Sequence, residues 1–470
     1  MNIKKLWLYG TIGLIYAGAS EHMLPPSEGV TDDDHAFETV IHYDQERGGY
    51  VLTNSGWRIG GDIRTGYVRY DYDNPPLFVD ATGTIVADEH INKGHADSRG
   101  FYVVPKLFVH SPKYGAFDIK VTVAGATDFG LNDSLYEQRT FVFDPKERKS
   151  FALLQEAYVR YDDGVHTFVA GAKETVTPMI DADDWYMLAN SFQGAYYVDR
   201  TFNEVVFAVG YFYKMAGVWD SGANGTQWHS MSQASFVDAD YKAIGGDKGV
   251  WTAAMRYKKG AHHFQLWEYY MPEYYNTFFA QYDYTAAYKG WHYDAGVQYI
   301  DFKEVGGLKR FYQARNKEID YGIVSFRFDG RFDNGCDFAL GASFFSDGGG
   351  TGDTLGAWGG YPYFANGMIF HFFEAGSLRH AKSYKLQVGY DFAAEGIKGL
   401  WSGVRLTRYD LDERYAFSST GEPQNAMTLL GFKTSYSDDA GHYATVTYEH
   451  VDLDEEPNAW ALRIIGGWRF

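Results

Sequence analysis

The sequence is short of several features that mark common classes of protein. Its 470 residues include a single cysteine, Cys336, so no disulfide can form within the chain, and disulfide-stapled scaffolds are excluded. We interpret Cys336 as a small strand residue, because no histidine partner for a catalytic thiol can be identified. Only 12 prolines occur, which favours long uninterrupted strands. Beyond the N-terminal segment there is no run of about 20 apolar residues, so a membrane-spanning helix is excluded there.

Basic residues are also scarce relative to acidic ones. The 42 Lys and Arg against 61 Asp and Glu give a formal net charge of -19. Nucleic acid binds to basic surfaces, so a nucleic-acid partner is not expected. Acidic clusters occur where loops are expected, at 31–34, 181–184 and 452–456. They are either solvated loops that keep the chain soluble during export, or sites where divalent cations bridge the protein to lipopolysaccharide.

The N-terminus has the pattern of an export signal. A short basic start precedes an apolar stretch at 6–18, and 17–19 reads Ala-Gly-Ala, a small-x-small cleavage site. We therefore expect residues 1–19 to be a signal peptide. The apolar part is too short to anchor the chain in a membrane, which leaves the periplasm, secretion or the outer membrane as destinations.

Aromatic residues and period-two alternation dominate the rest of the chain. There are 39 Tyr, 34 Phe and 12 Trp, and Tyr and Trp favour the interface between bilayer and water. Ile59 and Ile63 alternate with Arg58 and Arg64, and alternate residues of a strand face opposite sides. One face is therefore apolar and the other charged. About 18 such segments are expected: 57–67, 99–110, 116–127, 151–161, 165–172, 191–199, 203–214, 249–258, 262–270, 276–288, 292–303, 318–328, 335–346, 382–392, 400–410, 426–437, 441–451 and 460–470.

The connections between these segments alternate between short and long. Short ones include 111–114 and 162–164, and long ones include 128–150 and 347–381. This alternation is typical of outer-membrane barrels, whose periplasmic turns are short and whose outer loops are long. We predict an all-β fold, a transmembrane antiparallel up-and-down β-barrel of about 18 strands. The barrel would span 57–470, with 20–56 as an N-terminal periplasmic segment.

The final segment carries a second indication of the outer membrane. Apolar residues alternate up to a terminal aromatic, Phe470. This pattern resembles the C-terminal signal that the barrel-assembly machinery reads in outer-membrane proteins. We therefore expect that machinery to be a partner, together with outer-membrane lipid and lipopolysaccharide.

Three blocks of sequence carry motifs that narrow the family. The motifs are Glu156-Ala157-Tyr158, Thr177-Pro178-Met179, Asp183-Asp184, Phe192-Gln193-Gly194, Phe279-x-Gln281-x-Asp283-Tyr284 and Ala357-Trp358-Gly359-Gly360-Tyr361-Pro362. On these motifs and their order the chain resembles the OprD-type porins, in particular the branch common in Epsilonproteobacteria, over about 57–470. The resemblance implies an 18-stranded barrel, often packed as a homotrimer, whose third outer loop folds inward at about 173–190.

The family also implies a ladder of basic side chains along the pore. Strand alternation gives a candidate set independently, because Arg or Lys facing lipid at the midplane costs about 2–4 kcal/mol and the lumen avoids that cost. These side chains either guide anionic solutes or pair with lumen carboxylates such as Asp62 and Glu156. The predicted pore-lining basic residues are Arg58, Arg64, Lys106, Lys120, Arg160, Arg256, Arg327, Arg405, Arg463 and Arg469.

The third loop departs from the family pattern. Relatives tend to have Gly-Arg-Gln where this chain has Gly-Ala-Lys at 171–173, and Arg and Pro where it has Tyr186 and Ala189. We expect a constriction that is less basic and more aromatic. The aspartates of 181–184 either oppose the ladder or cap a turn that faces water. The residues expected to shape the constriction are Lys173, Asp181, Asp183, Asp184 and Tyr186.

No catalytic constellation, cofactor motif or metal site is recognisable. His262 and His263 are neighbours in a strand and point to opposite faces, and His90 and His95 lie in a long loop. We expect a non-enzymatic porin for small solutes, favouring anionic or carboxylate-bearing molecules such as amino acids or organic acids. The alternatives are an outer-membrane enzyme and a structural or adhesive barrel with a plugged lumen, for which 20–56 is a candidate plug.

Overall fold

The computed structural model of the protein describes most of the chain. The predicted signal peptide at 1–19, and His90 and His95, lie outside the described residues. The described residues are 41–43, 50–52, 56–72, 78–79, 85–86, 98–132, 142, 149–183, 187–217, 228–235, 240–315, 318–348, 355–369, 378–416, 423–454 and 458–470.

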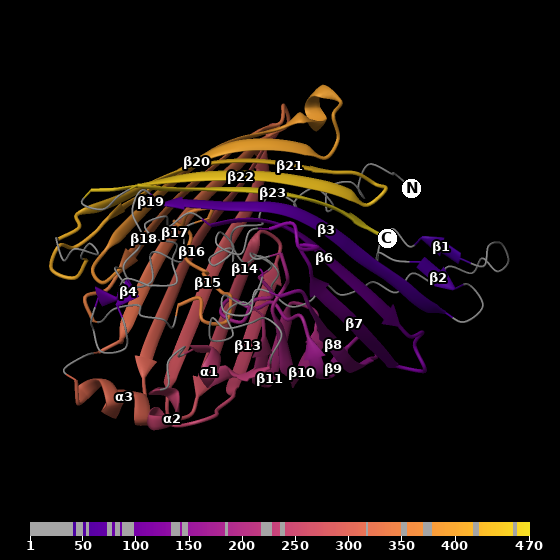
Figure 1. Cartoon of the computed structure of the whole chain (residues 1–470), viewed down its shortest axis with the longest axis horizontal. Coiled ribbons are helices and arrows are strands. Elements are labelled where there is room, and N and C mark those ends of the chain that lie inside the picture. Colours follow the sequence, from indigo (N-terminus) through magenta and orange to yellow (C-terminus); the bar gives the residue numbers. More distant parts are fainter. Residues whose placement is uncertain are drawn as a thin grey trace.

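An antiparallel sheet that closes on itself forms the body of the protein (Figure 1). Over the described residues the closed barrel has 18 strands, and the last, β23 (Ala459–Arg469), pairs with the first, β3 (Trp57–Tyr72). The predicted all-β barrel of about 18 strands is confirmed. Between these two the strands are β6 (Ser98–His110), β7 (Phe117–Ala126), β8 (Phe151–Asp162), β9 (His166–Lys173), β10 (Ser191–Phe202), β11 (Val205–Ala216), β13 (Val250–Lys259), β14 (His262–Met271), β15 (Tyr275–Tyr288), β16 (Trp291–Glu304), β17 (Tyr321–Phe332), β18 (Cys336–Phe345), β19 (Lys382–Asp391), β20 (Leu400–Asp410), β21 (Ala426–Ser437) and β22 (His442–Leu453).

Short elements outside the barrel were not predicted from the sequence. β1 (Ile41–Tyr43) and β2 (Tyr50–Leu52) form a hairpin that pairs with the start of β3, inside the segment expected to precede the barrel. The connections contain the remaining elements, which are too short for a periodic signal: β4 (Phe78–Val79), β5 (Ile85–Val86), β12 (His229–Ser230), α1 (Met231–Ser235), α2 (Asp240–Ile244), α3 (Gly306–Gln313) and the 3-10 turn η6 (Phe392–Glu395).

The outer face of the barrel is apolar. On β19, Leu386 and Val388 are 47% and 53% exposed, whereas Ser383 and Gln387 on the opposite face are buried. A continuous band of such exposed side chains is unfavourable in water and favourable in lipid, so the band faces a bilayer. No helix in the described part of the chain is long and apolar enough to cross a membrane.

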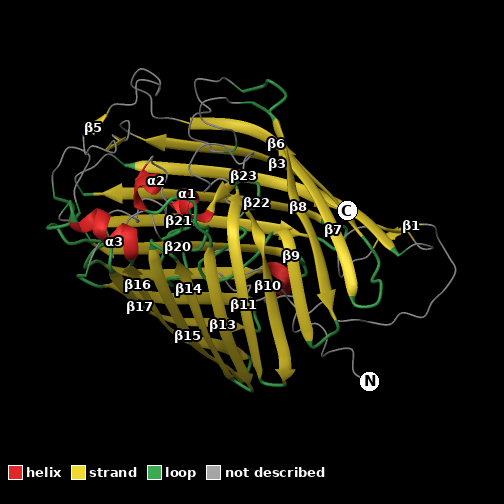
Figure 2. Cartoon of the chain, turned by 90° about the horizontal axis from the view of Figure 1, so that it is seen from below, coloured by secondary structure: helices red, strands yellow, loops and turns green. Residues whose placement is uncertain are grey.

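The two ends of the barrel differ. The C-terminus and the β1–β2 hairpin lie at one end, and α2 and α3 lie at the other (Figures 1 and 2). The end that carries the C-terminus has the short turns. Lys289 and Gly290, which join β15 to β16, both have positive φ (47° and 79°), as a two-residue type I′ turn requires.

Aromatic side chains fill part of the barrel interior. Phe302 of β16 stacks on Tyr321 of β17 with ring centroids 4.8 Å apart, and Tyr275 of β15 lies 4.6 Å from Phe302. Trp358, from the connection between β18 and β19, completes this cluster 5.4 Å from Tyr275. All four side chains are buried. The interior beside β15, β16 and β17 is therefore packed like a protein core at this cluster, which leaves less of the lumen for water.

Glycines on the inward face let side chains pair across an intervening strand. Gly296 of β16 is in register with Asp283 of β15 and with Arg327 of β17. The Arg327 guanidinium and the Asp283 carboxylate form an ion pair of 2.8 Å across it. A Cβ on Gly296 would lie 2.6 Å from Oδ1 of Asp283 and 2.8 Å from Nε of Arg327, so only glycine leaves room. We call this arrangement a glycine slot.

The substitution Gly296→Ala is expected to destabilise the barrel by about 2–3 kcal/mol, because it pushes apart an ion pair that is buried. Urea unfolding in lipid vesicles, followed by tryptophan fluorescence, measures this change. Gly466→Ala in β23 is the matched control, because a Cβ there would meet its nearest neighbour at 3.4 Å, an ordinary contact. Equal destabilisation by the two substitutions would contradict the role of the slot.

Candidate functional site

The connection between β9 and β10 crosses the barrel interior. Its first residue, Glu174, forms an ion pair with Lys106 of β6, and its backbone N–H donates to Oε1 of Glu156 on β8 at 3.3 Å. Further along, the Thr177 hydroxyl accepts a hydrogen bond of 2.9 Å from the hydroxyl of Tyr269 on β14. The connection thus reaches from the wall at β6 and β8 to the wall at β14. We call residues 174–190 the constriction loop.

The constriction loop then returns to the wall from which it started. Arg64 of β3 donates from Nη1 to the Met187 carbonyl at 3.3 Å. Gln155 of β8 donates from its side-chain amide to the Ala189 carbonyl at 2.9 Å. These attachments hold the returning part of the loop beside β3 and β8.

A second connection, between β18 and β19, also folds inward over its described part, 355–369. The Asp181 N–H donates to the Trp358 carbonyl at 2.9 Å, and Ile180 forms a β-bridge with Gly359. A Cβ on Gly360 would lie 2.3 Å from the Pro178 carbonyl oxygen, so this glycine permits the close approach of the two loops. We call 355–369 the bracing loop.

The bracing loop is fixed to the barrel wall on its other side. The Arg405 guanidinium on β20 donates to the Gly367 carbonyl at 3.0 Å. The Glu449 carboxylate on β22 accepts from the N–H groups of Met368 and Ile369, at 2.7 and 2.5 Å. The bracing loop therefore contacts the constriction loop on one side and is bonded to the barrel wall at β20 and β22 on the other.

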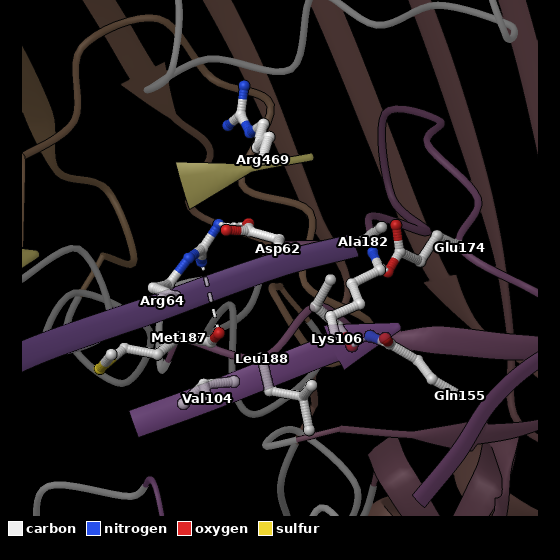
Figure 3. Close-up of a pocket in the computed structure, with 11 residues that line it drawn as sticks. Asp62, Arg64, Val104, Lys106, Gln155, Glu174, Ala182, Met187, Leu188 and Arg469 are labelled. Atoms are coloured by element: carbon white, nitrogen blue, oxygen red, sulfur yellow. Dashed lines mark hydrogen bonds and ion pairs between the residues drawn. The ribbon is translucent and has the colours of Figure 1, made fainter. Parts of the chain in front are cut away.

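A cavity of about 240 Å³ remains between the constriction loop and the wall at β3, β6, β8 and β23 (Figure 3). Three cations and two carboxylates are the charged side chains among the described residues that line it. Arg64, Lys106 and Arg469 come from the wall, as does Asp62, while Glu174 comes from the loop. The remaining lining residues are Val104, Gln155, Ala182, Met187, Leu188 and Ala189.

Four of the five charged side chains that line the cavity form two pairs of opposite charge. Arg64 lies 3.6 Å from Asp62, both on β3, and Figure 3 shows these two side chains next to each other. Lys106 points toward Glu174, with which it forms the ion pair described above. Opposite charges thus stand together on a partly buried surface, where charge interactions are stronger than in bulk water.

A buried carboxylate organises the base of the constriction loop. Glu156 of β8 is 1% exposed, pairs with Lys120 of β7 at 2.9 Å, and accepts from the Thr122 hydroxyl at 2.7 Å. It also accepts the N–H of Glu174. The predicted pairing of lumen bases with carboxylates therefore occurs at this position, and here it ties the loop to the wall.

The ten basic residues predicted to line the pore all lie on the strand face opposite to the exposed apolar side chains. Arg405, for example, stands between the outward-facing Val404 and Leu406. The structure gathers three of the ten at the cavity: Arg64, Lys106 and Arg469. The other seven are Arg58, Lys120, Arg160, Arg256, Arg327, Arg405 and Arg463, and they are distributed over the rest of the wall.

The acidic residues predicted for the constriction have different positions. Asp181 and Asp183 are absent from the described lining of the cavity, and the backbone of Asp181 bonds to the bracing loop. Lys173 ends β9, with its ammonium 5.2 Å above the ring of Tyr158. Asp184 and Tyr186 lie outside the described residues.

Several of the residues that line the cavity were not predicted from the sequence. Glu174 directly follows Lys173, yet no periodic pattern extends into the loop to indicate which acid turns inward. Gln155 is neighbour to the predicted Glu156, but a bulge in the pairing of β7 and β8 shifts the alternation there. Met187 and Leu188 carry no charge, so a search for basic and acidic residues passes over them.

Among the described residues, no group of three or more His, Cys, Asp and Glu is placed to hold a metal ion. Cys336 is exposed at the start of β18. His262 donates or accepts a hydrogen bond of 2.8 Å with the Tyr282 hydroxyl, an outward-facing partner.

Solved structures of bacterial outer-membrane proteins have the same fold. OpdK from Pseudomonas aeruginosa superposes with a TM-score of 0.66 at 15% identity, covering 88% of this chain and 98% of that one. OccK9 (OpdG) from the same species gives 0.68 at 13%, and a BenF-like porin from Pseudomonas fluorescens Pf-5 gives 0.65 at 15%, both with coverages of 88% and 98%. OpdK has also been solved with vanillate. No protein-family model and no curated protein matches the chain.

Proposed function

We propose that this chain is an OprD-type porin of the outer membrane, through which small solutes diffuse passively. The observation that carries the proposal is a closed barrel with an apolar outer face and, inside it, a charged cavity between the wall and the constriction loop. A barrel that excludes lipid from a polar interior is suited to transport. The fold shared with the Pseudomonas proteins and the sequence motifs support the same assignment, and the motifs alone support the epsilonproteobacterial branch.

We propose further that the cavity favours anions, in particular carboxylates such as those of amino acids and organic acids. Arg64, Lys106 and Arg469 supply three cations against the two carboxylates of Asp62 and Glu174. Arginine presents paired N–H donors that match the two oxygens of a carboxylate. Vanillate, the molecule solved with OpdK, carries a carboxylate, which agrees with this preference.

The barrel would be oriented with its short turns in the periplasm and its long connections outside. Residues 1–19 would be removed on export, and the barrel-assembly machinery would recognise the segment that ends at Phe470. Lipopolysaccharide would surround the outer rim, and three copies would pack as a homotrimer. The orientation is inferred from the turns, because the short turns of outer-membrane barrels face the periplasm. The C-terminus lies at the end of the barrel that has the short turns, so it would face the periplasm as well.

Planar-bilayer recording of the refolded protein tests the proposal. Under a KCl gradient, we expect open-channel currents whose reversal potential corresponds to anion preference. Liposome swelling with neutral, anionic and cationic solutes of similar size then ranks the solutes. A correctly folded barrel that carries no current would overturn the porin assignment, and equal swelling rates for anions and cations would overturn the anion preference.

A further inference from the structure

Tyr443 of β22 contacts three charged residues of the cavity, although it is not among the described residues that line it. Its hydroxyl accepts a hydrogen bond of 3.1 Å from Nε of Arg64 and donates one of 2.7 Å to Oδ1 of Asp62. Its ring faces two guanidinium groups, with centroid distances of 4.7 Å to Arg469 and 5.8 Å to Arg64. The side chain of Tyr443 thus contacts Arg64, Arg469 and the Asp62 carboxylate.

A glycine slot brings Tyr443 to these partners. Tyr443 is in register with Gly467 of β23, which in turn is in register with Arg64 of β3. A Cβ on Gly467 would lie 2.4 Å from the Tyr443 hydroxyl oxygen, so the phenol crosses β23 only because that position is glycine. The contact therefore depends on two residues whose sequence positions give no hint of their joint role.

The chemistry of a phenol suits this position. A hydroxyl can accept one hydrogen bond while it donates another, so it links the Arg64 guanidinium to the Asp62 carboxylate. The electron-rich ring face attracts cations, and it reduces the mutual repulsion of Arg64 and Arg469. Phenylalanine retains the ring and loses the link.

We propose that Tyr443 is the positioning residue of the cavity and that it determines the preference for planar carboxylates over spherical anions. The phenol holds Nε of Arg64, in addition to the contacts of Nη1 with the Met187 carbonyl and of Nη2 with the Asp62 carboxylate. With this third attachment the guanidinium keeps one orientation, and a fixed fork of N–H donors matches a carboxylate better than it matches chloride. A guanidinium that is held less firmly attracts both anions mainly by its charge. This inference rests on the proposed porin function and names the selectivity of the same cavity.

Reversal potentials under bi-ionic conditions, potassium acetate against potassium chloride, test the proposal. Tyr443→Phe is expected to lower the acetate-to-chloride permeability ratio by about threefold, because both hydrogen bonds of the phenol are lost while the charges of Arg64 and Asp62 remain. The chloride-to-potassium ratio should change much less, because no charge is removed. Gly467→Ala should have the same effect with Tyr443 still present, because the added methyl group displaces the phenol.

Tyr448→Phe is the matched control, because Tyr448 lies on the same strand and its side chain points outward. The acetate-to-chloride permeability ratio of this variant should equal that of the wild type. Unchanged ratios in both Tyr443→Phe and Gly467→Ala would overturn the positioning role. If the wild type conducts and both variants keep its selectivity, only this inference is overturned. If the wild type does not conduct, the porin function itself is overturned.

Discussion

A variant in which residues 174–191 are replaced by an Asn-Gly turn is expected to conduct at least about twice the current of the wild type. Lys173 and Phe192 are paired directly across β9 and β10, so a two-residue turn can join them without disturbing the ladder. The replacement removes the constriction loop and leaves the 18 strands intact. Single-channel recording gives the conductance. Anion preference should fall as the conductance rises, because ions in the wider pore can pass farther from Arg64, Lys106 and Arg469.

Shortening of the connection between β20 and β21, 411–425, provides the control for this variant. The described residues of that connection are absent from the cavity lining, so its removal should leave the conductance unchanged. Far-UV circular dichroism and the shift of the folded barrel on unheated gels verify that both variants fold. A loopless barrel that conducts like the wild type would mean that the narrowest point lies elsewhere.

Neutralising Arg64, Lys106 and Arg469 together by substitution with Gln is expected to reverse the ion preference of the pore from anions to cations. Asp62 and Glu174 would then be the only charged side chains in the described lining of the cavity. A narrow path with low-dielectric walls focuses the field of such charges on the permeating ion. The sign of the reversal potential in a KCl gradient measures the change directly, and raising the salt concentration should weaken it.

The matched control removes the same number of positive charges from exposed positions. The side chains of Lys259, Lys303 and Arg310 are largely exposed, although each forms an ion pair. None of the three lines the cavity. Their joint substitution by Gln changes the net charge equally and should leave the reversal potential where it was. An identical shift in the two triple variants would show that total charge, and not the cavity, governs selectivity.

Strand alternation was sufficient to predict the barrel and the face on which each residue lies. Arg58 and Ile59 fall on opposite faces because the side-chain period of a strand is two, whatever the surroundings are. The length of the strands and the alternating connections then gave about 18 of them. These features depend on neighbouring residues alone, so a single sequence contains them.

Features that depend on register and on loop contacts could not be predicted in the same way. The slot at Gly467 requires knowing which residues of three strands stand in one row, and alternation specifies a face without specifying a row. The bracing loop was recognised as a motif at 357–362, yet its inward path depends on contacts such as Asp181 with Trp358. The loop aspartates were assigned to the constriction by their charge. Among the described loop residues, the acid that lines the cavity is Glu174, which is fixed by its pairing with Lys106.

The seam between β3 and β23 sets the order in which the barrel can be completed. Neighbouring strands of the barrel elsewhere follow one another along the chain, but at the seam the Thr65 hydroxyl donates to the Gly466 carbonyl from 401 positions away. Contacts of such long sequence separation form slowly, because the entropy of closing the loop is lost before they are made. Until then β3 and β23 are two open edges that attract other strands, so the yield of folded protein depends on how well those edges are shielded during assembly.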